Sequence, residues 1–265
     1  MLHTLRALTF DDVLLVPGYN GIKSRQDVTT QVKLNDFIFE TPLVTSNMDT
    51  ITESAMARVM IERKGLAILH RFMTVENNVT MFKELASPQY VGFSIGVGKG
   101  GLERAEALMG AGAQICCVDV AHGHSKEVNR TVRALRESYK DSIFIIAGNV
   151  ATYAGADYLA AAGADAIKVG IGCGSVCTTR MKTGYGVPQL SAIFDCHKVD
   201  RYIIADGGIR YPGDAVKAFA AGADMVMLGG MLAGTDETPG RVIEKIDESG
   251  QPGRFKQFRG MASRE

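Results

Sequence analysis

Residues 142–175 read SIFIIAGNVATYAGADYLAAAGADAIKVGIGCGS and contain one complete strand–helix–strand unit. A β-branched apolar run is followed by an Ala-rich segment with a helical pattern, and a second apolar run begins after Gly163-Ala164-Asp165. Glycine at such a position supplies the left-handed residue that ends a helix, and the small alanine lets the chain turn tightly. Because both runs are short, apolar and end in small or polar residues, they predict buried parallel strands.

The same unit recurs along the chain. Gly-Ala-Asp returns at 222–224 and Gly-Ala-Gln stands at 112–114, each between a helical segment and an apolar run. Eight such strands favour an α/β fold of the closed (β/α)8 type, a TIM barrel, over an open doubly wound sheet, which is the alternative. Since such barrels need roughly 250 residues, we expect residues 1–265 to form a single domain. The predicted strands lie within 42–49, 65–71, 90–98, 114–123, 142–150, 166–175, 202–208 and 225–230.

Composition and charge narrow the class of protein. The chain is 46% hydrophobic and 22% charged, as expected of a globular domain, and its 29 basic residues balance 29 acidic ones. This balance does not indicate a partner such as nucleic acid. No apolar run reaches the roughly 18 residues of a membrane helix, and Asp11 and Asp12 interrupt any signal-peptide core. The five cysteines lack zinc-site spacing and fit a reduced environment, so we expect a cytoplasmic protein. From the charge balance and the short apolar runs we expect that it binds neither nucleic acid nor membranes.

The loop after the sixth predicted strand is the most unusual segment of the chain. Gly170, Gly172 and Gly174 alternate in it, so its backbone carbonyl and amide groups can turn toward a ligand or a monovalent cation. Cys177 lies in the same loop, near backbone amides and Arg180, where the thiolate form would be favoured as a nucleophile. The alternative is a cysteine that only fills space. For Cys116, Cys117 and Cys196, which fall in strands or helices, packing is the better interpretation.

Polar and glycine residues also follow other predicted strands. Asp206-Gly207-Gly208 and Gly229-Gly230 end the seventh and eighth strands, where barrels commonly hold a phosphate with backbone N–H groups. Asp206 could accept hydrogen bonds from ribose hydroxyls, so the two turns favour a nucleotide 5′-monophosphate, although plain structural turns are the alternative. Side chains at other strand ends point into the barrel mouth, and their spacing builds no convincing catalytic metal site. These residues are Asn47, Asp49, His70, Asp119, His122, His124 and Asn149.

Five motifs together resemble the IMP dehydrogenase/GMP reductase family over essentially the whole chain. They are LTFDDVLLVPG (8–18), AGNVAT (147–152), KVGIGCGSVCTTRMKTGYGVPQLSA (168–192), IIADGGI (203–209) and VMLGGMLAG (226–234). The resemblance implies that Cys177 attacks C2 of the purine and that Thr179 relays a proton. It also implies that both branches of the family exchange a hydride at C2.

The resemblance assigns further residues by kind of site. The nucleotide's phosphate and ribose would be held by Ser175, Asp206, Gly207, Gly208, Gly229 and Gly230, and its base would be lined by Gly260, Met261 and Ala262. The cofactor would contact Ser24, Arg25, Asp119, Val120 and Ala121. A potassium-like ion would be bound by the carbonyl oxygens of Gly172, Gly174 and Cys177. The family also implies a homotetramer.

Sequence features favour the GMP reductase branch, which would convert GMP to IMP and ammonia with NADPH. Lys23-Ser24-Arg25 and Asn47-Met48-Asp49-Thr50 look like the reductase, and arginine suits the 2′-phosphate of NADPH. The short interval between the second and third strands leaves no room for a regulatory insert. The alternative is an IMP dehydrogenase without that insert, forming XMP with NAD, because AHGHS (121–125) and GTDETPG (234–240) look more like that branch.

Some features depart from both branches. Cys173 replaces the usual proline of the catalytic loop, and we expect the family's mobile flap and C-terminal segment to lie beyond Glu265. Without the flap, a nucleotide-binding or regulatory barrel that performs no turnover is a second hypothesis. A phosphate-binding barrel isomerase is a third, but it leaves the cysteine loop unexplained.

Overall fold

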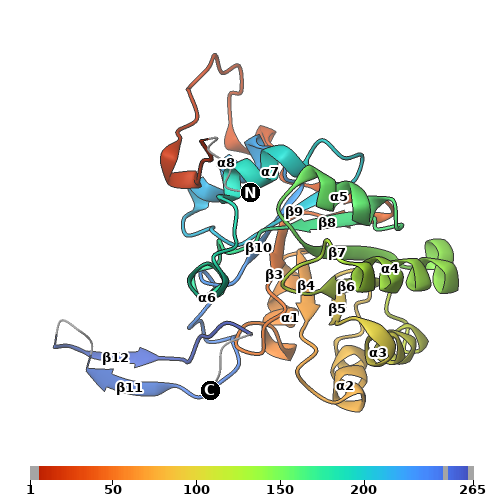
Figure 1. The fold of residues 1–265 in the computed structure, drawn as a ribbon. Helices are drawn as coiled ribbons and strands as arrows, with labels where there is room; N and C mark the ends of the chain where they lie inside the picture. The colour runs from red at the N-terminus through yellow and green to blue at the C-terminus, as the bar shows by residue number, and fades with distance from the viewer. Residues whose placement is uncertain (1–5, 247–249, 262–265) are drawn as a thin grey trace.

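The computed structural model describes residues 6–246 and 250–261 and shows a closed barrel of eight parallel strands in the order β10-β3-β4-β5-β6-β7-β8-β9 (Figure 1). The barrel closes where Val226 of β10 pairs with Leu43 of β3. Each predicted run contains one strand, so the predicted TIM barrel is confirmed. The strands are β3 (Leu43–Thr45), β4 (Leu66–Leu69), β5 (Val91–Ile95), β6 (Ile115–Asp119), β7 (Phe144–Val150), β8 (Ala166–Val169), β9 (Tyr202–Asp206) and β10 (Met225–Leu228).

Helices follow the strands and cover the outside of the barrel (Figure 1). The helix stops predicted at the Gly-Ala motifs are present, because Gly163 and Gly222 both have φ +106° and Gly112 has φ +95°. The α-helices are α1 (Ser54–Glu62), α2 (Val75–Leu85), α3 (Gly98–Gly110), α4 (Lys126–Tyr139), α5 (Tyr153–Ala160), α6 (Thr179–Thr183), α7 (Gln189–Cys196) and α8 (Pro212–Ala220). The described part of the chain also contains the 3-10 helices η1 (Phe10–Asp12), η2 (Arg25–Asp27) and η3 (Lys140–Ser142).

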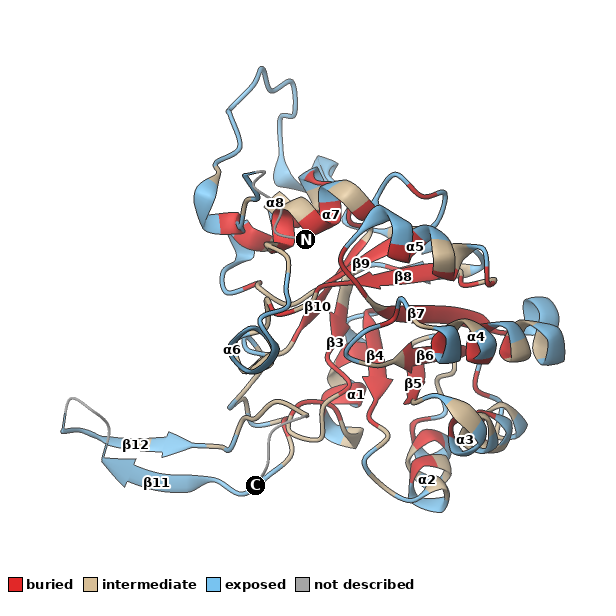
Figure 2. Cartoon of the chain, viewed as in Figure 1, coloured by how far each residue is buried: buried red, intermediate tan, exposed pale blue. Residues whose placement is uncertain are grey.

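The core has two shells, which the alternation of each strand creates. Leu66 and Ile68 of β4 belong to the cluster inside the barrel, whereas Ala67 and Leu69 belong to the larger cluster between strands and helices. All four are fully buried, and Figure 2 shows the barrel strands as the buried centre of the molecule. This packing fixes the strand ends from which the functional loops emerge.

A short antiparallel hairpin, which the sequence did not predict, fills the N-terminal end of the barrel. It consists of β1 (Val32–Leu34) and β2 (Phe37–Phe39). Leu34 and Phe39 are each 1% exposed and belong to the inner cluster. Phe37 packs edge-on against Phe144 at the start of β7, with ring centroids 5.7 Å apart. The opposite, C-terminal end therefore carries the loops that are open to ligands.

A second unpredicted hairpin, β11 (Ile243–Ile246) and β12 (Pro252–Phe255), projects away from the barrel (Figure 1). Two basic residues anchor the chain that returns from it. Lys256 Nζ donates to the backbone carbonyls of Thr235 (2.9 Å), Asp236 (3.0 Å) and Thr238 (2.6 Å). Arg259 forms an ion pair of 2.7 Å with Asp49 at the mouth. Within the described residues, no helix is long and apolar enough to cross a membrane.

Candidate active site

A cavity of about 810 Å³ opens at the C-terminal ends of the barrel strands. The loops after β8, β9 and β10 form most of its wall, and the N-terminal segment, the loop after β3 (Ser46 and Met48) and Phe258 complete it. Parallel strands in a barrel bring these loops to one face, as the sequence predicts. Site residues predicted from the sequence that line the cavity are Gly172, Gly174, Ser175, Asp206, Gly207, Gly208, Gly229 and Gly230.

The cysteine loop owes its path to glycine. Gly170 has φ +150°, and a Cβ atom there would collide with the backbone carbonyl of Asp206. Gly172 has φ +81°, and its Cβ would lie 2.6 Å from Cγ of Arg180. Only glycine allows both the left-handed backbone and this close approach to the end of β9. The loop therefore folds directly against the Asp206 turn.

Cys177 and Thr179 lie side by side in the loop after β8, between the cavity-lining residues Val176 and Arg180, but neither of them lines the cavity itself. The Sγ atom of Cys177 is 3.2 Å from Oγ1 of Thr179, and both residues are half-buried. Val176, the neighbour of Cys177, lines the cavity. Thr179 begins α6, a short helix that follows the loop (Figure 1). At this separation the hydroxyl can accept a hydrogen bond from the thiol and relay its proton to a stronger base, which would favour nucleophilic attack by sulfur.

The other four thiols are poor nucleophiles. Burial raises the pKa of Cys116 and Cys117 strongly and that of Cys196 to about 12, so the interpretation of these three as packing residues fits. Burial, followed by the charge of Asp206, raises the pKa of Cys173 to about 12. Its Sγ lies 3.2 Å from both Oε1 of Gln189 and the carbonyl oxygen of Asp206. Cys173 thus acts as a neutral hydrogen-bond donor that holds the loop.

The two diglycine turns present unused backbone donors to the cavity. The N–H groups of Gly207, Gly208, Gly229 and Gly230 donate no hydrogen bond to any of the described residues. A Cβ on Gly230 would lie only 3.0 Å from Oγ of Ser175, so the serine hydroxyl stands next to this turn. Amide donors beside a hydroxyl suit the oxygens of a phosphate group.

The predicted cation ligands can be tested against their hydrogen bonds. The carbonyl oxygen of Gly174 accepts the N–H of Cys177 at 3.1 Å. The carbonyl oxygens of Gly172 and Cys177 accept no hydrogen bond from residues 6–246 or 250–261. Two of the three predicted carbonyl oxygens are therefore open to a cation, and the third is shared with an N–H group, so the cation site stays a prediction.

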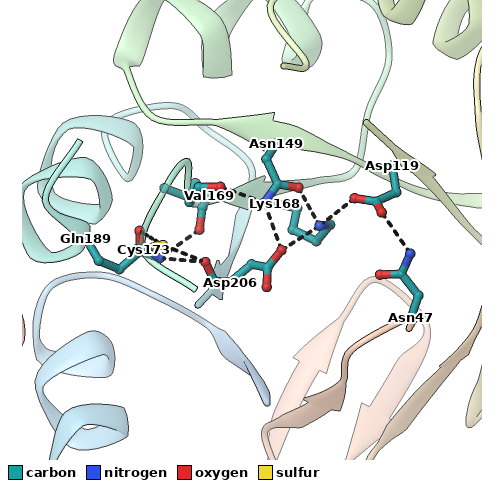
Figure 3. A network of polar contacts seen from close by, with 9 residues as sticks. Asn47, Asp119, Asn149, Lys168, Val169, Cys173, Gln189 and Asp206 are labelled. Carbon is teal, nitrogen blue, oxygen red and sulfur yellow. Dashed lines mark hydrogen bonds and ion pairs between the residues drawn. The ribbon is translucent and has the colours of Figure 1, made fainter. Parts of the chain in front are cut away.

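A buried ionic network, absent from the sequence predictions, spans the barrel mouth (Figure 3). Lys168 of β8 is 2% exposed, and its Nζ lies 2.7 Å from Asp119 Oδ1 and 2.6 Å from Asp206 Oδ2. It also contacts Oδ1 of Asn149. Asn47 donates to Oδ2 of Asp119 at 2.9 Å. Burial would raise the pKa of Asp119, but the charge of Lys168 and the hydrogen bonds from Lys168 and Asn47 outweigh it and lower that pKa. The only sequence signal was a lysine inside an apolar strand.

Several predicted residues are not brought to the cavity. Ser24 and Arg25 are exposed and lie at η2, at the end of an extended N-terminal loop. Asp119, which ends β6, and the following Val120 and Ala121 do not line the cavity. Gly260 and Met261, which come after β12, do not line it either, although the nearby Phe258 does. Ala262 lies outside the described residues. The roles of these residues remain predictions.

Comparisons with known proteins agree with this geometry. The family model described as the IMP dehydrogenase/GMP reductase domain matches residues 7–265. GMP reductase 2 of Bos taurus is 40% identical, with 97% of this chain and 75% of that protein covered. The inosine-5′-monophosphate dehydrogenase of Nitrosopumilus maritimus (strain SCM1) is 35% identical over 97% of this chain and 80% of its own length. The crystal structure of inosine 5′-monophosphate dehydrogenase from Legionella pneumophila superposes with a TM-score of 0.88 and 54% identity, covering 97% of this chain and 78% of that one.

Proposed function

Because this chain belongs to the IMP dehydrogenase/GMP reductase family and is an oxidoreductase of purine nucleotides, we propose that it is a GMP reductase. The observation that carries this choice is the hydrogen bond of 2.9 Å from Asn47 to Asp119. The motif Asn47-Met48-Asp49-Thr50 after β3 resembles the reductase through Asn47. The small residue that is usual at this position in the dehydrogenase could not reach the carboxylate of Asp119. The proposed reaction converts GMP, NADPH and one proton to IMP, ammonia and NADP+.

The proposed chemistry starts at Cys177. Its sulfur attacks C2 of GMP, and Thr179, 3.2 Å away, relays the thiol proton toward the departing amine. The C2–N bond breaks, ammonia leaves, and C2 remains bound to sulfur as a thioimidate. Bound NADPH supplies a hydride to C2. The C2–S bond then breaks, so that the electron pair returns to sulfur and IMP is released. The resulting thiolate takes up a proton from water, which restores the thiol.

The nucleotide is proposed to bind along the loops after β8, β9 and β10. Asp206 lines the cavity, and its Oδ1 accepts no hydrogen bond from the described residues, so this oxygen could accept from the ribose hydroxyls. Ser175 and the N–H groups of the two diglycine turns would hold the phosphate. Gly260, Met261 and Ala262 would approach the base.

Other assignments rest on the family resemblance together with these contacts. NADPH would bind at Asp119, Val120 and Ala121, with Ser24 and Arg25 on their exposed loop as further contacts. Potassium would bind the carbonyl oxygens of the cysteine loop. We also propose a homotetramer and a cytoplasmic location, the latter supported by five free cysteines.

The second candidate is an IMP dehydrogenase that uses NAD. It is favoured by the 54% identity to the Legionella pneumophila enzyme of that title. The carbonyl groups available for a cation and the thiol–hydroxyl pair serve either reaction.

Absorbance at 340 nm separates the candidates. With GMP and NADPH, a steady loss of absorbance is the expected result. A gain with IMP and NAD would instead identify the dehydrogenase, and nucleotide binding without any change would indicate a binding protein. Cys177→Ala should abolish turnover, whereas Cys196→Ala, a buried cysteine on α7, is the matched control. Full activity of Cys177→Ala would rule out the covalent step.

A further inference from the structure

Lys168 occupies a position between two carboxylates that belong to different strands. Its ammonium group comes from β8, Asp119 ends β6 and Asp206 ends β9, so one charge connects side chains from three strands (Figure 3). The lysine side chain is 3% exposed, whereas the two aspartate side chains are 26% and 20% exposed. The cation is thus enclosed, and the carboxylates reach toward the mouth.

The hydrogen bonds leave each carboxylate fixed in orientation. Oδ2 of Asp206 accepts Lys168 at 2.6 Å and Asn149 at 2.8 Å, which leaves Oδ1 without a donor among the described residues. Asp119 is held through Oδ1 by Lys168 at 2.7 Å and through Oδ2 by Asn47 at 2.9 Å. Without the ammonium, each carboxylate would keep one amide contact and could rotate about its Cα–Cβ bond.

Stability alone is a weak reason for this arrangement. A buried ion pair costs desolvation energy that its attraction does not always recover, and apolar residues of similar size often stabilise a core as well. One lysine also balances only part of the charge of two aspartates. The pairs lie at the C-terminal strand ends, where barrel enzymes place their functional groups.

We propose that Lys168 is a positioning residue shared by the nucleotide site and the cofactor site. The inference rests on the proposed function, in which Asp206 binds the nucleotide ribose and Asp119 contacts the cofactor. Lys168 touches neither ligand and acts by holding both carboxylates. Each aspartate serves one site, whereas the lysine serves both.

The test compares Lys168→Met with Asp119→Asn and Asp206→Asn. Steady-state kinetics give KM for GMP and for NADPH, and calorimetry gives Kd for GMP without cofactor. Asp206→Asn should mainly raise KM for GMP, and Asp119→Asn should mainly raise KM for NADPH. Lys168→Met should raise both by about tenfold or more, because it removes a charge-assisted hydrogen bond from each carboxylate. Lys168→Arg, which keeps the charge, should recover part of both losses.

A change in only one KM of Lys168→Met, or a fall in kcat with both KM values unchanged, would overturn the proposal. Thermal melts establish that each variant is folded. If Lys168→Met does not fold, Lys168→Met/Asp119→Asn is compared with Asp119→Asn alone, and an unchanged Kd for GMP would equally overturn it. Wild-type protein that turns over neither substrate pair would refute the proposed function instead, since the shared role of Lys168 requires measurable binding at both sites.

Discussion

Replacing Gly170 by alanine should damage both stability and turnover. The positive φ of +150° is unfavourable for an L-residue, and the new methyl group would meet the carbonyl oxygen of Asp206. The backbone conformation costs about 1–2 kcal/mol and the overpacking about 1–3 kcal/mol, so the free energy of unfolding should fall by about 2–5 kcal/mol. The loop that carries Cys177 would be displaced from β9. A shift on the order of 1 Å at a reacting group can lower kcat/KM about 100-fold.

Gly112→Ala is the matched control for this substitution. Gly112 also has a positive φ, +95°, but a Cβ there would have no neighbour within 4 Å, and it lies between α3 and β6, away from the mouth. Gly112→Ala should lower the free energy of unfolding only by the cost of the backbone conformation, about 1–2 kcal/mol, and should leave kcat/KM unchanged. Urea unfolding and steady-state kinetics measure the two quantities. Equal losses of stability in both variants, with full activity of Gly170→Ala, would refute the packing argument.

Three further predictions concern single side chains. Cys173→Ser should keep most of the activity. In wild type, iodoacetamide should modify Cys177 before Cys173, because the pKa of the Cys173 thiol is raised to about 12. Peptide mass mapping measures the order of modification, and preferential labelling of Cys173 would contradict this prediction. The lowered pKa of Asp119 stabilises the fold above the usual value of 3.8, and this contribution is lost as pH falls below 3.8 through the folded-state pKa. Urea unfolding is measured from about pH 6 to about pH 3 for wild type and Asp119→Asn. The difference between their free energies of unfolding should shrink at the acidic end, and a constant difference would argue against this contribution of Asp119. Lys256→Met should increase proteolysis at 235–238, since it removes the ammonium donor from three carbonyls, and unchanged cleavage rates would show that this anchor is dispensable.

The fold was predictable because buried parallel strands leave a strong local signal. Apolar β-branched runs, each followed by a glycine-ended helix, need no knowledge of distant contacts to be recognised. The two hairpins were missed because, unlike the equally short barrel strands, their strands are not followed by a helix, and those of the second hairpin, β11 and β12, are largely exposed. Their position depends on tertiary packing, as with Phe37 against Phe144.

The site was predictable where a loop's own residues define it. The glycines and Cys177 indicate an irregular segment that faces a ligand. The barrel topology then predicts that the loops after β9 and β10 lie beside it. Lys168 was not recognised, because its partner Asp206 lies 38 residues further on and Asp119 lies two strands earlier. Phe258 lines the cavity wall, and no pattern in the sequence indicated it, because the contacts of Lys256 and Arg259 that hold its segment are made with residues distant in the sequence.

The hairpin of β1 and β2 has a consequence for the order of events in a catalytic cycle. Leu34 and Phe39 seal the N-terminal end of the barrel with side chains that are each 1% exposed, so no small molecule passes through its axis. Arrival and departure must then share one entrance, and whichever molecule sits deepest leaves last. Product-inhibition patterns should therefore be those of a sequential mechanism in which substrates bind and products leave in a fixed order.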